Sequence, residues 1–368
     1  MFSSLYVDNF RCLTNLEIRF GDLSLLVGEN GTGKSSVIDI LYRLRDLASG
    51  RAKAVELFPA ADLCHWDQRA VQAFELAADL EDEAFSYRVE IEHDSGRRRS
   101  RIIVERVTLG ERPLFEFRQG QVQLYRDDYS KGPSYSFDWG SSALSSLLET
   151  GSNSKLVKFR KFLSSTLVVR PVPPNMTSFS ETEEAILERD GSNFASWFRH
   201  FTLEHPSDTF ELQKSLQEIW PGFHEWRYSQ FSEETRTFRI VRRTPDGRAV
   251  DTRFDALSDG ERVRLLLYAL LAAIRSDNRV LVLDEPENFL GLREIQPWLL
   301  EFRDIVTDFE AQGIIASHHP ELINYLGRDD GIWMRRDGVG PTRITDEAPT
   351  IPEGGVSLAD YVIRGWTD

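Results

Sequence analysis

Cysteine is scarce in this chain: Cys12 and Cys64 are the only two among 368 residues. Two cysteines cannot build the disulfide framework of a small secreted domain, and no cluster of cysteine or histidine has the spacing of metal ligands. The chain also lacks an apolar run of about 18 residues, which a membrane span would need, and its first residues do not follow the signal-peptide pattern. We therefore expect a cytoplasmic protein with no membrane part.

Positive charge is also in short supply, because 44 lysines and arginines stand against 59 aspartates and glutamates, a formal net charge of −15. This balance argues against a surface coated for nucleic-acid binding, although it leaves room for a local basic groove. The one dense basic run, Arg97-Arg98-Arg99-Ser100-Arg101, follows Asp94-Ser95-Gly96. This placement predicts a β-hairpin turn with a solvated exit strand, and a contact to a phosphate backbone is the alternative.

The first fifty residues carry a clear strand, loop and helix pattern. Leu16, Ile18 and Phe20 alternate with polar residues, which indicates a half-buried strand. Residues 23–27 are almost continuously apolar, as in a strand buried on both faces. After a glycine-rich segment, residues 35–47 have apolar side chains at helical spacing.

The rest of the chain alternates between strand-like and helix-like segments. Residues 72–123 predict an antiparallel sheet, and the Ser- and Gly-rich residues 127–156 predict a mobile connection. Residues 181–222 predict helices, in which an aromatic stripe at helical spacing indicates core packing: Phe194, Trp197, Phe198 and Phe201. Strands are predicted again over 230–253. No internal repeat is present, and no heptad run is long enough for a coiled coil.

The last third predicts a helix followed by two buried strands. The helix covers residues 259–275, and the apolar strands cover 280–283 and 313–316. Polar residues follow each strand directly. In open α/β sheets this carboxyl edge is where ligands bind, so we expect chemistry there.

The glycine-rich segment from Gly28 to Ser35 matches the pattern G-x-x-x-x-G-K-[ST]. Glycines let backbone N–H groups converge on phosphate oxygens, and the following helix offers its positive N-terminus. Lys34 would place a charge at the β- and γ-phosphates, and the Ser35 hydroxyl would be a ligand of Mg²⁺. We predict that ATP is bound by residues of this segment: Gly28, Asn30, Gly31, Thr32, Gly33, Lys34, Ser35 and Ser36.

Asp284 and Glu285 follow the first of the two apolar strands. We expect Asp284 to hold Mg²⁺ through water, and Glu285 to orient and deprotonate the attacking water. An acidic pair at a strand end is often only a solvated terminus, which is the alternative. Two interpretations are open for Glu287, two residues further on: a supporting acid behind the site, or a simply exposed side chain. Exposure is favoured.

Two further elements complete the predicted site. In Leu257-Ser258-Asp259-Gly260-Glu261, Ser258 and Glu261 form a helix capping box, and the helix start is also suited to meet a γ-phosphate. Because 222 residues separate Lys34 from the start of this segment at Leu257, that phosphate is expected to be held by a second subunit. His318, after the second strand, is predicted to sense the γ-phosphate, with a purely structural role as the alternative.

The order of these motifs resembles that of ABC-type ATPases of the SMC/RecF/OLD group, which include bacterial proteins identified as AAA-family ATP-binding proteins without transmembrane parts. The matching segments are Asn9-Phe10-Arg11, Gly28–Ser35, Leu257–Glu261, Val280–Glu287 and Ser317–Pro320. The resemblance covers roughly residues 1–48 and 250–335. The stretch 190–194 also resembles an element of the smaller members.

The resemblance implies an α/β fold, namely a two-lobed ABC-type P-loop ATPase head. Such a head has a mixed or parallel central sheet with helices, a flanking antiparallel sheet and a short helical insertion. It would comprise residues 1–165 and 230–368, with lobe I mainly in 1–125 and lobe II mainly in 250–345. Residues 166–229 would be the helical insertion.

The resemblance also implies that two heads sandwich two ATP molecules. Lys34, Glu285 and His318 would then be catalytic, and Arg11 would lie near the nucleotide. The signature residues would act in trans: Ser258, Asp259, Gly260 and Glu261. The glutamine that usually follows the phosphate loop in the family has two weak candidates here, Gln68 and Gln72.

This sequence departs from parts of the family. Its signature reads LSDGE rather than the transporter form LSGGQ. The insertion is too short for a long coiled coil, and about fifty residues after His318 are too few for the nuclease domain of OLD proteins. We therefore expect an ATP- and Mg²⁺-dependent dimer, or a higher oligomer, that acts as a switch for a separate effector such as a nuclease or toxin, or as a nucleic-acid clamp. Bacterial genome defence is favoured over DNA repair. The alternatives are a transporter ATPase subunit and a slow ATP-binding regulatory module.

Overall fold

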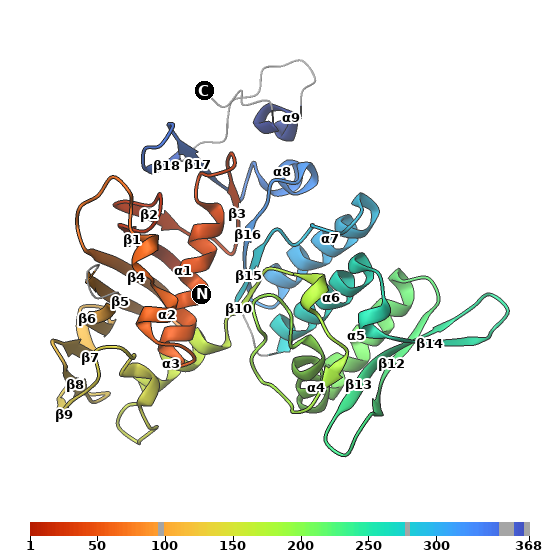
Figure 1. Cartoon of the computed structure of the whole chain (residues 1–368), viewed down its shortest axis with the longest axis horizontal. Coiled ribbons are helices and arrows are strands. Elements are labelled where there is room, and N and C mark those ends of the chain that lie inside the picture. Colours follow the sequence, from red (N-terminus) through yellow and green to blue (C-terminus); the bar gives the residue numbers. More distant parts are fainter. Residues whose placement is uncertain (95–98, 277–279, 346–356, 364–368) are drawn as a thin grey trace. The chain divides into compact units, whose positions relative to one another are not determined.

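The computed structural model describes residues 1–94, 99–276, 280–345 and 357–363. The chain divides into two compact units, which are coloured along the sequence in Figure 1. Unit 1 comprises residues 1–166 and 323–368, and unit 2 comprises residues 167–322. No helix in the described ranges is long and apolar enough to span a membrane.

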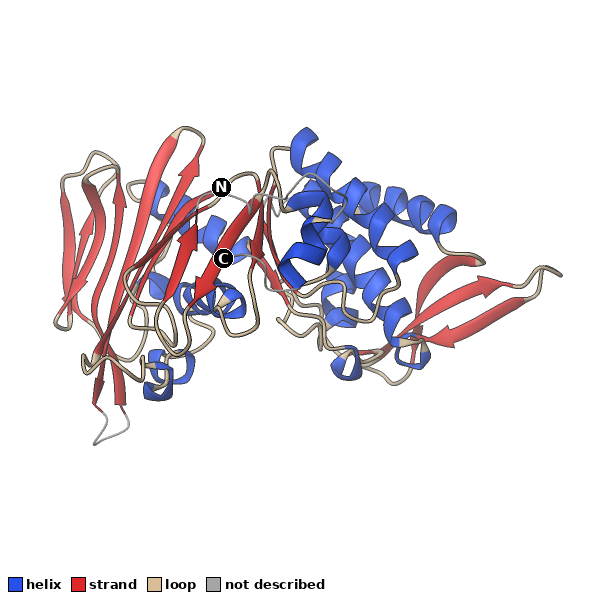
Figure 2. Ribbon diagram, turned by 90° about the horizontal axis from the view of Figure 1, so that it is seen from above, coloured by secondary structure: helices blue, strands red, loops and turns tan. Residues whose placement is uncertain are grey.

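Eight antiparallel strands form the main sheet of unit 1, which Figure 2 shows with its helices. In β4 every second residue is buried, the alternation of a sheet with one face on the core. The antiparallel sheet predicted over residues 72–123 is therefore confirmed. In spatial order the strands are β2 (Leu16–Arg19), β1 (Phe2–Asp8), β4 (Val71–Leu80), β5 (Glu83–Asp94), β6 (Arg99–Leu109), β7 (Arg112–Arg118), β8 (Gln121–Tyr125) and β9 (Lys131–Ser136).

Aromatic side chains fill the core between this sheet and the helices of unit 1. Phe159 stacks on Phe85 with ring centroids 5.5 Å apart and lies 5.9 Å from Tyr87. Phe162 meets the edge of Phe2 at 5.3 Å. Phe159 and Phe162 belong to α3, which also contacts α1. The helices are α1 (Lys34–Ala48), α2 (Ala54–Leu57) and α3 (Ser154–Ser165).

A smaller group of strands in unit 1 carries the phosphate loop. β3 (Leu23–Val27) is buried along its whole length and runs parallel to β17 (Gly331–Arg336). β17 pairs antiparallel with β18 (Thr342–Thr345). The strand and helix predicted on either side of the loop are thus confirmed as β3 and α1. Short helices α8 (Pro320–Leu326) and α9 (Leu358–Ile363) complete the C-terminal part.

Unit 2 is built on three parallel strands in the order β10 (Leu167–Val169), β15 (Val280–Asp284) and β16 (Gln312–Ala316). The two strands predicted at 280–283 and 313–316 are confirmed, and β10 was not predicted. Helices α6 (Asp259–Ser276) and α7 (Leu292–Asp308) pack together, with Trp298 Nε1 donating to the Leu267 carbonyl at 3.2 Å. The α/β class predicted from the sequence is confirmed.

A second sheet in unit 2 packs against helices. Its central strand is β13 (Arg236–Arg243). Three strands pair antiparallel with it: β11 (Phe179–Ser180), β12 (Phe223–Gln230) and β14 (Ala249–Arg253). The helices are α4 (Phe194–Glu204) and α5 (Pro206–Ile219). The predicted aromatic stripe on α4 is buried, which confirms its role in the core: Phe194, Trp197, Phe198 and Phe201.

Two predicted segments differ from the structure. Residues 127–156 were predicted to be a mobile connection. They contain β9 and the 3-10 helix Leu144–Ser146, so that prediction was wrong. Serine and glycine suit β9 because it is an edge strand with one exposed side. The helical insertion expected over 166–229 contains the helices α4 and α5, but also the strands β10, β11 and β12, which were not predicted. β10 has three residues, too few for a periodic signal.

Candidate functional site

The phosphate loop of unit 1 wraps around the Lys34 ammonium. Lys34 Nζ donates to the carbonyl oxygens of Gly28 at 2.6 Å and Glu29 at 3.1 Å. The loop closes on itself through Thr32, whose hydroxyl donates to the Glu29 carbonyl at 2.8 Å. α1 begins at Lys34, with no acidic residue in its first turn and no side-chain cap on its N-terminus. A phosphate would therefore meet a lysine and the positive end of a helix.

Gly33 is required by the space around it and by its backbone. Its φ is 97°, in the left-handed region that side chains disfavour. A Cβ at this position would lie 2.8 Å from both Cys12 Sγ and Leu13 Cδ2. Gly31 also has a positive φ, of 85°. The glycines predicted to shape the loop therefore have a structural reason to be there.

The loop is also held by β17 and β18, which sequence reasoning did not connect with it. Thr342 Oγ1 donates to the buried Thr32 carbonyl at 2.7 Å, and Arg336 Nη1 donates to the Gly31 carbonyl at 3.0 Å. These partners lie more than 300 positions apart in the chain. No local pattern reveals such a contact, because it exists only through the pairing of β17 with β3.

Arg11 lies beside α1 in a cluster of charges. It donates to Asp62 at 2.8 Å and to Asp39 of α1 at 2.5 Å. Arg43 also donates to Asp62, at 2.5 Å. Burial alone would raise the pKa of Asp62, but the hydrogen bonds from Arg11 and Arg43 outweigh it and lower that pKa. Asp39 is four residues after Ser35, so Arg11 lies within about a turn of the loop-bearing end of α1. Its contact with a nucleotide stays a prediction.

The two candidate glutamines have different settings. Gln72 is fully buried, and its Nε2 donates to the carbonyls of Asn9 and Asp62, both at 3.0 Å. Its Oε1 lies 2.9 Å from His93 Nε2. The amide of Gln72 therefore holds the core of unit 1 together. Gln68 is exposed in the connection before β4. The assignment of the family's glutamine stays open between them.

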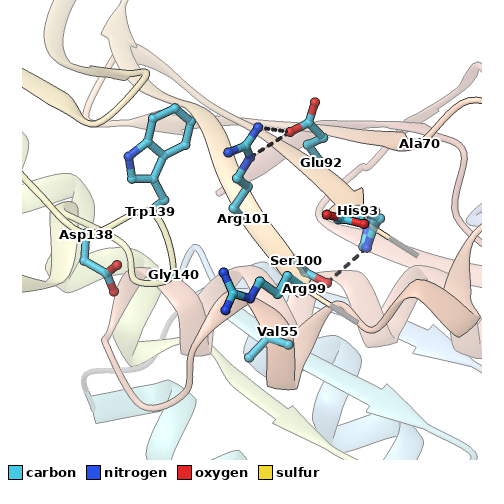
Figure 3. Close-up of a pocket in the computed structure, with 11 residues that line it drawn as sticks. Val55, Ala70, Glu92, His93, Arg99, Ser100, Arg101, Asp138, Trp139 and Gly140 are labelled. Carbon is cyan, nitrogen blue, oxygen red and sulfur yellow. Dashed lines mark hydrogen bonds and ion pairs between the residues drawn. The ribbon is translucent and has the colours of Figure 1, made fainter. Parts of the chain in front are cut away.

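His93 lines a cavity of about 860 Å³ at the β5–β6 hairpin of unit 1 (Figure 3). Its Nδ1 lies 3.0 Å from the hydroxyl of Ser100, and burial lowers its pKa. Arg99 and Arg101 of the basic run lie on β6 here, and Arg101 pairs with Glu92 of β5. The paired strands confirm the predicted hairpin, whereas its turn, residues 95–98, lies outside the described residues.

In unit 2 the ends of the parallel strands carry the predicted acids and histidine. Asp284 is fully buried opposite Ala316, and the Glu285 N–H donates to the Ala316 carbonyl at 2.8 Å. Glu285 has a φ of 51°, so the chain turns sharply after β15. The Glu285 carboxylate lies 3.4 Å from His318 Nδ1 and accepts from Asn288 Nδ2 at 3.0 Å. The residues predicted as general base and phosphate sensor therefore lie side by side.

Two arginines that sequence reasoning missed approach these acids. Arg189 Nη2 lies 3.3 Å from the Asp284 carboxylate, and Arg170 lies 3.8 Å from both Asp284 and Glu285. Arg170 directly follows β10, so the short apolar run before it was an available signal. The Arg170 N–H donates to the Arg189 carbonyl at 2.7 Å, which holds the two segments together.

The expectation that Glu287 is exposed was wrong. Only 4% of Glu287 is accessible, because its side chain turns inward to meet Ser317 after β16. Ser317 Oγ donates to Glu287 Oε1 at 2.5 Å and accepts from the His319 N–H at 2.9 Å. Burial raises the pKa of Glu287, and its Oε2 is buried without a hydrogen-bond partner among the described residues. Glu287 thus ties the loop after β15 to the loop that carries His318.

The predicted signature residues form the start of α6. The Glu261 carboxylate accepts from the Ser258 N–H at 3.0 Å, and the Glu261 N–H donates to Ser258 Oγ at 3.3 Å, so the capping box is confirmed. Ser258 is exposed. A Cβ on Gly260 would lie 2.7 Å from the Phe289 carbonyl, so a bare backbone is needed there. The in-trans role of this segment stays a prediction.

The donors predicted for Mg²⁺ are oxygen atoms, which suits a hard cation. They are the hydroxyl of Ser35, half-buried in the first turn of α1, and the carboxylate of Asp284, buried at the end of β15. Across the described ranges no group of three or more His, Cys, Asp or Glu is placed to hold a metal ion. Mg²⁺ is typically bound by one or two protein ligands together with substrate phosphates and water, so each donor suits it by its chemistry. Their joint role stays a prediction, because they belong to different units.

The chain is similar to one protein family and to solved structures of Smc head domains. A family model described as "AAA domain, putative AbiEii toxin, Type IV TA system" matches residues 23–324. No curated protein matches the chain. A crystal structure of the SmcHead bound to the C-winged helix domain of ScpA is similar with a TM-score of 0.56 and 13% identity, covering 94% of this chain and 96% of that one. The Smc head domain with an extended coiled coil bound to the C-terminal domain of ScpA, derived from Pyrococcus furiosus, has a TM-score of 0.58 and 11% identity, covering 94% and 95%.

Proposed function

We propose that this chain, which belongs to the AAA family whose model it matches, hydrolyses ATP with Mg²⁺. Its fold is that of an ABC-type, SMC-like ATPase head. The observation that carries the proposal is the phosphate loop of unit 1. There Lys34 lies across the backbone of Gly28 and Glu29 at the uncapped N-terminus of α1. This arrangement binds the β- and γ-phosphates through a charge and through backbone N–H groups.

Ser35 and Asp284 would hold Mg²⁺, which supplies charge neutralisation at the phosphates when bound. Asp284 is fully buried and faces Arg189, so its carboxylate is held in one orientation. Glu285 accepts the proton of the attacking water, because it is the partly exposed carboxylate next to His318. His318, more than half exposed, donates to or accepts from the reacting phosphate group.

We infer that hydrolysis needs two copies of the chain. Ser258 lies exposed at the start of α6, where a helix N-terminus and the bare backbone of Gly260 suit a phosphate. The Ser258 hydroxyl is within 3.1 Å of Glu261 in the single chain, so the segment is ordered before any partner arrives. We propose that it completes the nucleotide site of a second head, and that ATP joins the two heads.

The partner that this switch controls is proposed to be a separate protein effector in bacterial genome defence, with DNA repair as the second setting. Support comes from the family description, which names a toxin and a type IV toxin–antitoxin system. Both similar Smc head structures also contain a bound domain of another protein, ScpA. The family description supports the defence setting, and the bound ScpA domains support a separate partner protein.

The hydrolysis proposal is tested by ATP turnover and mass measurement. Lys34→Ala should abolish ATP binding, because Lys34 is the only positively charged side chain in the loop sequence Gly28–Ser35. Glu285→Gln should still bind ATP but turn it over about 10²- to 10⁴-fold more slowly, the range for loss of a general base, and should accumulate as a dimer with ATP. Glu17→Gln, on the exposed face of β2, is the matched control and should behave as wild type.

Two outcomes would contradict these assignments. Wild-type turnover by Glu285→Gln would remove the general-base role. A Glu285→Gln chain that stays monomeric with saturating ATP would remove the two-head model. The in-trans role of Ser258 is tested by mixing Ser258→Arg with Lys34→Ala chains, which should restore at most one working site per dimer. Full wild-type activity of that mixture would contradict it.

A further inference from the structure

The second sheet of unit 2 has two chemically different faces. On the inner face Trp226, Tyr228 and Phe238 pack against α4. Phe198 of α4 lies 5.0 Å from the Trp226 ring and 5.5 Å from the Phe238 ring. Because successive residues of a strand point to opposite sides, the residues between these aromatics point to the outer face.

A row of three arginines crosses this outer face. Arg227 of β12 lies opposite Arg239 of β13, and Arg239 lies opposite Arg253 of β14. Neighbouring strands are about 4.8 Å apart, so the row spans roughly 10 Å. Like charges directly opposite each other destabilise a sheet. Acidic residues outnumber basic ones in the chain, which has a net charge of −15. Three arginines in one row are therefore not explained by a general excess of basic residues.

Acidic neighbours neutralise this row only in part. Asp251 of β14 is shared, since it accepts from Arg239 Nε at 2.8 Å and also from Arg227. Arg253 pairs with Asp255 at 2.6 Å. About half of the Arg227 and Arg253 side chains stays exposed. By the strand register, four arginines of β12, β13 and β14 lie on this face, Arg227, Arg239, Arg243 and Arg253, against two acidic residues of these strands, Glu225 and Asp251.

Two exposed aromatic rings lie next to the row. Phe179 of β11 is paired with Thr237, two positions before Arg239, and therefore lies on the same face. Phe231, in the β12–β13 turn, is 68% exposed and meets Phe179 edge to face at 5.2 Å. The guanidinium of Arg253 lies over the Phe179 ring at 5.4 Å. Aromatic rings beside arginines form a surface on which bases can stack while phosphates are bound.

Two other arginine-bearing surfaces in the described part of unit 1 have more acidic neighbours. On the main sheet of unit 1, Arg88 lies opposite Arg106 in the same way. There, however, Arg88 is bound by Glu75 and Glu90, and Arg106 by Glu116. The cavity of Figure 3 is lined by two arginines, Arg99 and Arg101, together with three acids among the described residues: Glu92, Asp94 and Asp138. The excess of arginine together with exposed rings therefore singles out the sheet of unit 2.

We propose that this outer face, called the arginine face and defined by Arg227, Arg239, Arg253, Phe179 and Phe231, binds a single strand of nucleic acid. The three arginines contact consecutive phosphates, and the two rings stack on bases. The inference deepens the proposed function, because it names the polyanion that the ATP-driven head holds. It is independent of hydrolysis, since the arginine face lies on other elements than the phosphate loop.

The experiment measures fluorescence anisotropy of a labelled oligothymidine strand with the purified chain, without nucleotide, over a series of salt concentrations. Replacing the three arginines by Gln should weaken binding by at least about tenfold and reduce the salt slope by up to about 2, at roughly 0.7 for each lost phosphate contact. Phe231→Ala should weaken binding roughly 5- to 150-fold at one base-stacking site, and the exposure of Phe231 makes this variant safe for folding.

The matched control replaces Arg88, Arg106 and Arg118 of unit 1 by Gln, the same change in net charge on another sheet. It should bind the strand as wild type does. Equal weakening by the control would overturn the arginine face as the site, and so would wild-type binding by both Phe231→Ala and the arginine triple variant. Tighter binding of a blunt duplex than of the single strand would overturn the base-stacking assignment. ATP turnover of the triple variant should equal wild type, so loss of turnover in Lys34→Ala and loss of strand binding here are separate results.

Discussion

Truncation of Glu287 is the change whose effect the structure defines best. Glu287→Ala removes the acceptor of the buried Ser317 hydroxyl, which is bonded at 2.5 Å. Ser317 is fully buried, so its hydroxyl would be left without that partner. A buried donor that loses its partner destabilises a protein by about 1–3 kcal/mol. For a unit of this size, about 2 kcal/mol lowers the melting temperature by roughly 4–8 °C.

Activity should fall together with stability, because Ser317 also accepts from the His319 N–H and so fixes the loop that carries His318. We expect a lower kcat for Glu287→Ala with little change in ATP affinity, since the phosphate loop is in unit 1. Glu287→Gln retains an acceptor for Ser317, and should keep most of both the stability and the kcat. The assays are thermal unfolding, steady-state ATP turnover and binding of a fluorescent ATP analogue.

The pH dependence of stability gives a separate test. Burial raises the pKa of Glu287, so the folded chain keeps a proton on this carboxyl in a pH range where the unfolded chain has lost it. The stability that comes from this group is complete below the unfolded pKa, near 4.3, and is lost as pH rises through the folded pKa. Glutamine does not titrate. The melting temperature of Glu287→Gln should therefore fall less steeply than that of wild type as pH rises from about 4 to 8.

This reasoning is refuted if Glu287→Ala melts and turns over as wild type does, because Ser317 would then not depend on Glu287. A parallel pH dependence of the wild type and Glu287→Gln would likewise show that Glu287 does not titrate differently in the two states. Glu111→Gln, in the exposed turn between β6 and β7, is a control that should change neither quantity.

Three further predictions concern the rest of the candidate site. Gly33→Ala should weaken ATP binding at least about tenfold, because an alanine at this positive φ costs roughly 1–2 kcal/mol and its Cβ would meet Cys12. A titration with a fluorescent ATP analogue checks this, and unchanged affinity would contradict it. Thr342→Val should weaken ATP binding about fivefold, by loss of about 1 kcal/mol at the Thr32 carbonyl, whereas wild-type affinity would show that β18 does not support the loop. Arg189→Gln should lower stability by about 1.5–3 kcal/mol, because the buried Asp284 carboxylate loses the nearer of the two arginines that approach it. A melting temperature equal to wild type would exclude this role.

Arrangements that depend on neighbouring positions were predictable from the sequence. The phosphate loop, β3 and α1 are consecutive, so their pattern could be read directly. The same holds for the capping box of Ser258 and Glu261, which needs only a spacing of three. Asp284 and Glu285 were identifiable because a buried strand precedes them. Each of these features depends on residues that are close in the sequence, so the residue types in one short segment are enough to predict its backbone conformation.

Contacts between distant segments were not predictable in this way. The inward turn of Glu287 requires Ser317, which arrives from a neighbouring strand. The approach of Arg189 to Asp284 joins residues 95 positions apart. The family glutamine is a similar case, since the burial of Gln72 follows from its packing beside Asn9 and His93.

The phosphate loop, its strand and its helix were therefore determined by the sequence alone, because hydrogen bonds and side-chain periods within one segment specify them. Only the tertiary structure decided that Thr342 supports that loop, that Glu287 is buried, and that three arginines of β12, β13 and β14 stand in one row. Strand register sets which residues lie opposite one another, and register results from the packing of whole sheets against their cores. No short window of sequence contains that information.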